Sequence, residues 1–253
     1  MPRRRLFAAA AAGALALAAL TGCRSDPTVA AYVDGSKITE TQVDHMVDDA
    51  QRAVDRDNQA TKGQQQPVQE SVPSRTQVVG VLVAERLTQQ VLSQRGITPQ
   101  PVDESQVAQF YQVPATSAYA SALATVLAGT QAIGQAVGAG YQPTDSDLRS
   151  VYDAAVTAGI LPANTFDQAK PQLQQVQGLP QDLAARNELV KAEGPAKVTV
   201  NPRYRPLAYP VERLSTQSGS FDSVLLPLGP GASQPVVDTK PTATPSADQP
   251  PQQ

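Results

Sequence analysis

A long stretch in the middle of the chain, residues 105–144, contains no charged side chain. A stretch of this kind must either cross a membrane or pack against other parts of a protein. Its glutamine, threonine and glycine residues are too frequent for a membrane-spanning helix. Its large apolar residues instead recur close to one helical face, separated by alanine, glycine and serine. These residues are Tyr119, Leu123, Val126, Leu127, Ile133 and Val137. We therefore expect a helix that packs closely through its small residues.

The beginning of the chain has the layout of a secretory signal. Three arginines at positions 3–5 precede an uncharged segment rich in leucine and alanine, residues 6–20. The next residues, Leu-Thr-Gly-Cys at positions 20–23, resemble the bacterial lipobox, in which the cysteine thiol is acylated, for example with palmitate. The apolar segment is too short to favour an uncleaved membrane helix. We predict a signal peptide over residues 1–22, cleavage between Gly22 and Cys23, and a lipid on Cys23 that holds the protein on the extracytoplasmic face of the cell membrane.

Composition excludes several classes of function. Loss of the three leading arginines leaves 17 basic against 23 acidic residues, a net charge of −6, which argues against nucleic acid as a partner. Cys23 is the only cysteine, so the mature chain has no internal disulfide and no thiolate metal cluster. His45 is the only histidine, and we expect it on the surface. No catalytic, phosphate-binding or calcium-binding spacing is present. We predict no enzyme activity, no metal and no cofactor.

Capping and turn residues predict the elements in the first half of the domain. Residues 28–33 are typical of a strand and end at an Asp-Gly turn. Thr39 and Gln42 form a capping box for the first helix. A second helix runs from a Ser74 cap to Arg95 and ends at Gly96. Because residues 78–84 are apolar on nearly every face, this helix should be central and buried.

The second half continues with shorter elements. We expect a helix over residues 102–112 and a second helix that begins after a Thr144 cap. A third helix should cover residues 166–176, with a Thr165 cap and a bend at Pro171, and a fourth should cover residues 182–193. Residues 197–201 alternate like a strand. We place a linker at 23–27, the folded domain at 28–214 and a tail rich in proline, serine and threonine at 215–253. That tail contains a short apolar island at residues 221–228, for which a strand is an open alternative, and the rest has too few large side chains to offset the entropy of ordering.

Several segments, taken in order, resemble the SurA/PrsA group of extracytoplasmic folding factors. Residues 30–39 (Ala-Ala-Tyr-Val-Asp-Gly-Ser-Lys-Ile-Thr) look like the opening of these proteins, and residues 82–98, ending in Gln-Arg-Gly-Ile-Thr, look like their buried helix and its exit. Residues 145–152 and 166–173 are similar to the helices on either side of the isomerase module. Residues 198–204 (Val-Thr-Val-Asn-Pro-Arg-Tyr) resemble the closing strand of such lipoproteins from high-GC Gram-positive bacteria.

The resemblance implies a mostly α fold, an N-terminal domain like that of SurA, in which the first strand pairs with the last in a short two-stranded sheet. It also implies a peptide-binding chaperone domain. Only a turn, about residues 159–164, stands where relatives carry a parvulin module, so no isomerase is expected. The partners would be unfolded or newly exported polypeptides; the alternative is an envelope assembly lipoprotein with one specific partner. The apolar face of residues 119–137 either lines a peptide-binding cradle or is ordinary core, and the sequence leaves both open.

Overall fold

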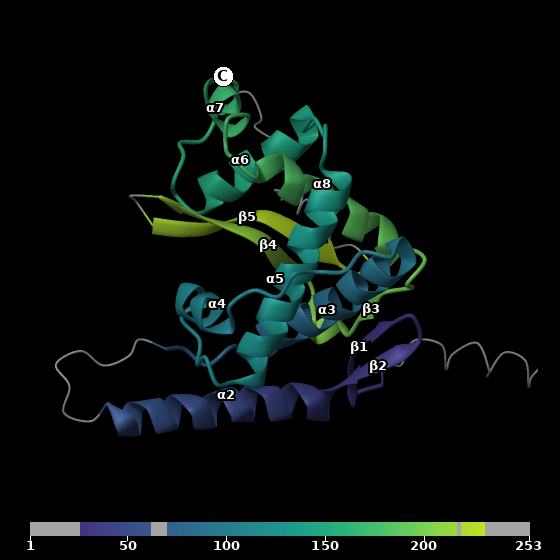
Figure 1. Ribbon diagram of the computed structural model, residues 1–253, viewed down its shortest axis with the longest axis vertical. Helices are drawn as coiled ribbons and strands as arrows, with labels where there is room; N and C mark the ends of the chain where they lie inside the picture. Colours follow the sequence, from purple (N-terminus) through teal and green to yellow (C-terminus); the bar gives the residue numbers. More distant parts are fainter. Residues whose placement is uncertain (1–25, 62–69, 217–218, 231–253) are drawn as a thin grey trace, which may run out of the picture.

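The protein consists of helices packed around two small antiparallel sheets (Figure 1). The computed structural model describes residues 26–61, 70–216 and 219–230. The predicted signal peptide, the cleavage site at Gly22 and the acylated Cys23 lie outside these residues. The elements are β1 (Val29–Val33), β2 (Ser36–Thr39), α2 (Glu40–Ala60), α3 (Arg75–Arg95), α4 (Glu104–Tyr111), α5 (Ala118–Val137), α6 (Asp145–Thr157), α7 (Phe166–Leu173), α8 (Leu179–Glu193), β3 (Thr199–Val200), η2 (Pro202–Tyr204), β4 (Leu207–Thr216) and β5 (Gly219–Leu228). The predicted mostly α class with a short β pairing is confirmed.

The first strand pairs with the last strand of the predicted domain, as expected. Ala31 on β1 lies opposite Val200 on β3 in an antiparallel register. The sheet nevertheless has three strands, because β2 adds to the other edge of β1. Asp34 and Gly35 both have positive φ, 49° and 73°, which is the backbone of a tight two-residue hairpin. The sheet was predicted to have two strands and has three. The Asp-Gly turn was recognised in the sequence, but the strand that follows it was not.

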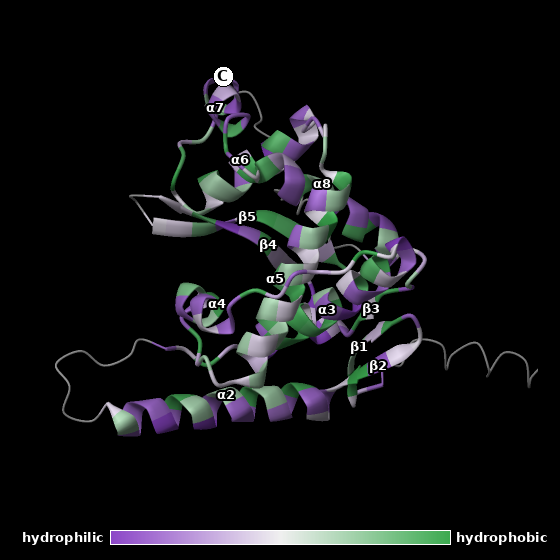
Figure 2. Ribbon diagram, viewed as in Figure 1, coloured by the Kyte–Doolittle hydropathy of each residue, from purple (hydrophilic) through white to green (hydrophobic). Residues whose placement is uncertain are grey.

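The central position of α3 is confirmed. Its apolar side chains are buried on several sides, and α5, α8, β1 and β4 all pack against it. Gly80 allows β4 to come close, because a Cβ at this position would lie 3.3 Å from the backbone oxygen of Ala208. The long α2, in contrast, alternates between hydrophilic and hydrophobic residues and buries one side only (Figure 2).

The uncharged α5 runs through the middle of the molecule in Figure 1 and packs closely through small residues, as predicted. A Cβ on Gly134 would lie 2.9 Å from the backbone oxygen of Gln181 on α8, which is too close for any side chain. A Cβ on Gly129 would overlap the side chain of Thr88 on α3. The two glycines thus set the approach of α5 to two neighbouring helices.

Three predicted helix boundaries were wrong. Helix α4 begins after an Asp103 cap rather than at Val102. The Thr165 hydroxyl donates to the Pro162 carbonyl and does not cap α7, which ends at Leu173 rather than at residue 176. Helix α8 begins at Leu179, three residues early, because proline is accepted in the first turn of a helix, where its missing N–H has no partner.

The largest correction concerns the end of the domain. Strands β4 and β5 form a long antiparallel hairpin in which Leu207 lies opposite Leu228. Residues 219–228 therefore belong to the folded domain, and the boundary predicted at Leu214 was too early. One face of the hairpin alternates buried residues that contact the helical core, including Tyr209 and Leu226. The apolar residues 221–228 are too few to form a core by themselves. Paired with β4, they complete a hairpin with one face packed on the helical core. The rest of the predicted tail, residues 231–253, lies outside the described residues.

Candidate functional site: the hairpin cleft

The structure places most of the candidate peptide-binding face of α5 in the core. Tyr119, Leu123, Val126 and Ile133 are all at least nine-tenths buried, while Leu127 and Val137 are half-buried against the same core. A continuous open cradle along α5 is therefore not present, and ordinary core is the better description of this face. Two of the six residues, Tyr119 and Leu123, nevertheless reach a cleft at the side of the helix.

Polar side chains of α2 either face solvent or bond to other parts of the protein. His45 is exposed on α2, as predicted. Asp44 on the same helix pairs with Arg75, and Asp49 accepts a hydrogen bond from the backbone N–H of Ala118 at the start of α5 (2.8 Å). Among the described residues, no group of three or more histidine, cysteine and acidic side chains is placed to hold a metal ion. No helix in the described ranges is long and apolar enough to span a membrane.

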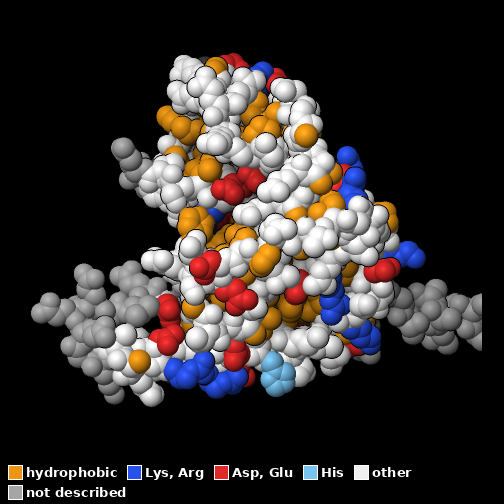
Figure 3. All heavy atoms as spheres, in the orientation of Figure 1, with side chains coloured by type: hydrophobic (Ala, Val, Ile, Leu, Met, Phe, Trp, Pro, Cys, Tyr) orange, Lys and Arg blue, Asp and Glu red, His pale blue; other side chains and the backbone are white. Residues whose placement is uncertain are grey.

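The cleft lies between the β4–β5 hairpin and the layer formed by α3, α4 and α5, and we call it the hairpin cleft. Figure 3 shows the molecule hollowed on its left side at this level. The cleft has a volume of about 260 Å³, enough for two or three side chains of a bound segment. Leu225 on β5 is 42% exposed beside it, one of the few large apolar side chains that the described surface shows to solvent. The cleft is lined by Gln77, Val81, Tyr111, Tyr119, Leu123, Ala208, Tyr209, Pro210, Arg213, Asp222 and Leu225.

Three tyrosines from three elements give the hairpin cleft its chemistry. Tyr111 ends α4, Tyr119 begins α5, and Tyr209 lies on β4. Tyr119 and Tyr209 are only 5% and 3% exposed. No hydrogen bond joins any of the three hydroxyls to another described residue, and none of the three oxygens is among the fully buried unpaired atoms, so each remains accessible. The cleft therefore presents hydroxyl groups that are available to a ligand, set in an apolar surface.

The electrostatics of the cleft keep these hydroxyls protonated. Burial raises the pKa of Tyr111 to about 12, and burial also raises the pKa values of Tyr119 and Tyr209. At neutral pH each phenol is therefore a hydrogen-bond donor and neither a base nor a nucleophile. The arrangement is suited to binding acceptor groups.

A single ion pair lies at the side of the cleft. The Arg213 Nε donates to Asp222 Oδ1 across the hairpin (2.7 Å), and the guanidinium lies 5.3 Å from the centre of the Tyr111 ring. Burial alone would lower the pKa of Arg213, but the hydrogen bond and the charge of Asp222 outweigh it and the pKa is raised. Because Asp222 already neutralises the arginine, the cleft carries little net charge and favours an uncharged, carbonyl-rich ligand.

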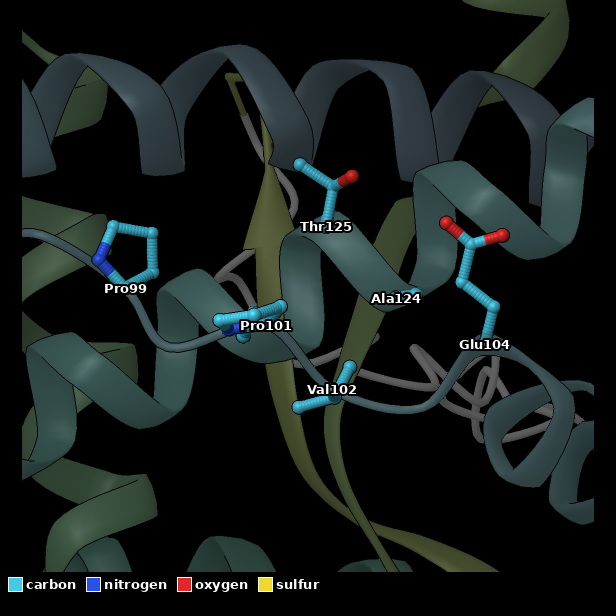
Figure 4. Close-up of a pocket in the computed structure, with 7 residues that line it drawn as sticks. Pro99, Pro101, Val102, Glu104, Ala124 and Thr125 are labelled. Atoms are coloured by element: carbon cyan, nitrogen blue, oxygen red, sulfur yellow. The ribbon is translucent and has the colours of Figure 1, made fainter.

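Two further pockets of similar size offer less chemistry. One, of about 240 Å³, lies between α5 and the segment that enters α4; Figure 4 shows Pro99, Pro101 and Val102 on that segment facing Ala124 and Thr125 on α5. Its one charged group is the Glu104 carboxylate. The other, of about 280 Å³, lies beside α4 and is lined mainly by alanine, glutamine and serine. Both are more open than the hairpin cleft, and neither contains an aromatic ring or a cation.

Sequence reasoning missed most of the cleft. Leu225 and Asp222 lie in the segment assigned to the tail, and Tyr209 and Arg213 lie just before it. One signal was present, since residues 207–211 (Leu-Ala-Tyr-Pro-Val) place leucine, tyrosine and valine at alternate positions, as in a half-buried strand. Comparison of this chain with family models, with curated proteins and with solved structures found no match.

Proposed function

We propose that this protein is a membrane-anchored extracytoplasmic lipoprotein that binds extended segments of unfolded or newly exported polypeptides in the hairpin cleft, in the manner of a chaperone and without isomerase activity. The observation that carries the proposal is the set of three tyrosine hydroxyls without protein partners, set in an apolar cleft beside the exposed Leu225. An extended polypeptide supplies what this surface lacks, because its carbonyl groups accept hydrogen bonds and its side chains cover apolar area.

The resemblance to the SurA/PrsA group supports the same function. Two of the segments that carry it, 30–39 and 198–204, form the hairpin β1–β2 and the strand β3 that pairs with it. The proposed acylation site, Cys23, lies six residues before Val29, where β1 begins. Six extended residues span at most about 20 Å, so the domain would bind its clients close to the membrane surface.

The proposal is tested by measuring client binding. The protein used is the chain of residues 24–253, which contains every residue that the structure describes. We expect it to suppress the aggregation of several unrelated denatured proteins. Leu225→Ser removes apolar contact area from the cleft and leaves the core intact. The lost contact is worth about 1–2 kcal/mol, so binding of a labelled, permanently unfolded protein should weaken at least about fivefold.

The matched control is Val190→Ser on α8. Val190 is 36% exposed and lies outside the hairpin cleft. This variant should bind clients as the parent chain does. Equal weakening in both variants, or in neither, would contradict the cleft as the binding site. Failure with every client, together with recovery of one envelope protein by pull-down, would instead favour the dedicated assembly lipoprotein.

The proposed absence of isomerase activity has its own measurement. The 24–253 chain should not accelerate cis–trans isomerisation of a prolyl tetrapeptide above the uncatalysed rate. Turnover that survives purification to homogeneity would overturn this part of the proposal.

A further inference from the structure

The hairpin cleft has a candidate occupant in the chain itself. The described part of the chain ends at Pro230, directly after β5. Beyond it, residues 234–238 read Gln-Pro-Val-Val-Asp, and the paired valines are the only large apolar side chains in residues 231–253. We propose that residues 234–238 bind in the hairpin cleft of the same molecule, where they compete with polypeptide clients. The competition rests on the proposed function, whereas the binding of the segment does not.

The first argument is distance. Strand β5 ends at Leu228, and Leu225, which lines the cleft, is three residues earlier. At about 3.3 Å per residue, the cleft begins about 10 Å from the end of the strand. Tyr209 is equally near, because it pairs with Leu226 on β5. Four residue steps separate Pro230 from Gln234 and span at most about 14 Å when extended, which covers this distance.

The second argument is the direction in which the chain leaves the hairpin. Gly229 adopts φ 85°, a left-handed conformation that ends the strand. It packs so closely on β3 that a Cβ would lie 2.9 Å from Val200 Cγ2. The chain therefore turns immediately after β5 instead of continuing along the strand axis.

The third argument is chemical fit. Proline favours an extended polyproline II backbone whose carbonyl groups have no internal hydrogen bonds. Such carbonyls are the acceptors that the hydroxyls of Tyr111, Tyr119 and Tyr209 lack among the described residues. Surfaces lined with aromatic rings recognise proline-containing segments in this way, at little entropic cost to the ligand. The two valines supply the apolar side chains that would cover Leu123 and Leu225.

Competition in solution tests the proposal. A fluorescein-labelled peptide of residues 231–242 is titrated with two forms of the 24–253 chain, the parent and Val236→Ser with Val237→Ser. In the parent chain the tethered segment has an effective concentration of about 1 mM and occupies the cleft. We expect the double variant to bind the peptide at least about fivefold more tightly than the parent, by fluorescence anisotropy.

The matched control replaces two other small apolar residues of the same tail, Ala243→Ser with Ala247→Ser, and should bind the peptide as weakly as the parent does. Addition of Leu225→Ser to the valine double variant should abolish the gain. The proposal is overturned if the peptide fails to bind the double variant at millimolar concentration, or if parent and double variant bind it equally. It is also overturned if the parent chain dimerises at micromolar concentration through this segment, since binding would then occur between molecules.

A permanently unfolded client, measured with the same two chains, separates this inference from the proposed function. Client binding that is equal in both chains, with no binding of the peptide, overturns the inference and leaves the proposed function intact. Peptide binding without client binding supports the inference and overturns the proposed function. Tighter binding of both ligands by the valine double variant supports both.

Discussion

Six of the seven tyrosines of this protein fall into two groups, one with bonded hydroxyls and one without. Tyr204 donates to Glu40 Oε2 (2.6 Å), Tyr152 donates to the Pro162 carbonyl (2.7 Å) and Tyr141 donates to Asp147 Oδ2 (2.7 Å). Tyr119 and Tyr209 are as deeply buried as Tyr204 and Tyr152, yet their hydroxyls have no partner among the described residues. The first group joins elements together, and the second faces a cleft. The contrast separates side chains that hold the fold from side chains available to a ligand.

The bonded group belongs to two polar networks that join separate elements of the fold. Glu40 at the start of α2 accepts from Tyr204 and Arg75 and pairs with Arg203 (Nη1 to Oε1, 3.4 Å). This node joins the first helix to α3 and to the residues that follow β3. It lies near the pairing of β1 with β3, where the two ends of the predicted domain meet.

Asp147 is the centre of a second network, between α6 and α8. Burial alone would raise the pKa of this carboxyl, but hydrogen bonds from Thr144 and Tyr141 outweigh it and lower the pKa. Arg186 donates to Oδ1 (2.8 Å), and Asn187 donates to the same oxygen (3.3 Å). Nothing comparable surrounds the hydroxyls of the hairpin cleft.

The largest expected effect comes from a residue that serves both as core and as the inner wall of the cleft. Leu123 is 2% exposed, so Leu123→Asp buries a carboxylate without a partner and should lower the free energy of unfolding by about 4 kcal/mol or more. The exposed Leu225→Asp should cost less than about 1 kcal/mol. Urea unfolding followed by circular dichroism measures both. Similar costs would remove the distinction between core and cleft rim.

Removal of a bonded hydroxyl should have the next largest effect. Tyr204→Phe deletes the hydrogen bond to Glu40 and leaves a buried carboxylate with one donor fewer. We expect a loss of about 1–2 kcal/mol in the free energy of unfolding, measured in the same way. A neutral result would mean that Arg75 and Arg203 satisfy Glu40 by themselves.

The matching change in the cleft should be nearly neutral. Tyr119→Phe removes a hydroxyl that has no protein partner, so the free energy of unfolding should change by no more than about 0.5 kcal/mol. Binding of an unfolded client, measured by anisotropy, should weaken by about threefold or more, because one donor to the client is lost. A destabilised Tyr119→Phe variant would show that this hydroxyl belongs to the bonded group.

A further expected effect is a dependence of stability on pH, which arises at the other face of the hairpin and along α8. Burial raises the pKa of Asp182 to about 6 and those of Glu193 and Glu212 to about 7. Each carboxyl binds its proton more tightly in the folded state than in the unfolded state. The free energy of unfolding should therefore rise as pH falls from about 8 to about 5, and this gain ends once the unfolded chain is protonated as well.

Unfolding in urea at pH 8.0, 6.5 and 5.0 measures this slope. Glu212→Gln should flatten it, because the carboxyl is replaced by an amide of the same shape. Asp153→Asn, at an exposed position on α6, is the control and should leave the slope unchanged. A stability that falls steadily from pH 8 to pH 5 would contradict the prediction.

Local signals predicted the first half of the fold well. The capping boxes of Thr39 with Gln42 and of Ser74 with Gln77 both form, and the αL glycine at position 96 ends α3. These features involve residues three or four apart, so a sequence displays them directly. The largest error occurred where a distant partner decides the outcome, since residues 219–228 form a strand by pairing with β4.

The amino-acid sequence by itself determined the helices apart from some of their ends, the close packing of α5 through small residues, and the pairing of the first strand with residues 199–200. It also supplied the lipobox, on which the proposed location depends. Only the tertiary structure decided that the apolar face of α5 is mainly core, and that the hairpin β4–β5 covers this core and opens a cleft beside it. The physical reason is that a hairpin strand and a buried tyrosine acquire their roles from long-range contacts, which local periodicity does not contain.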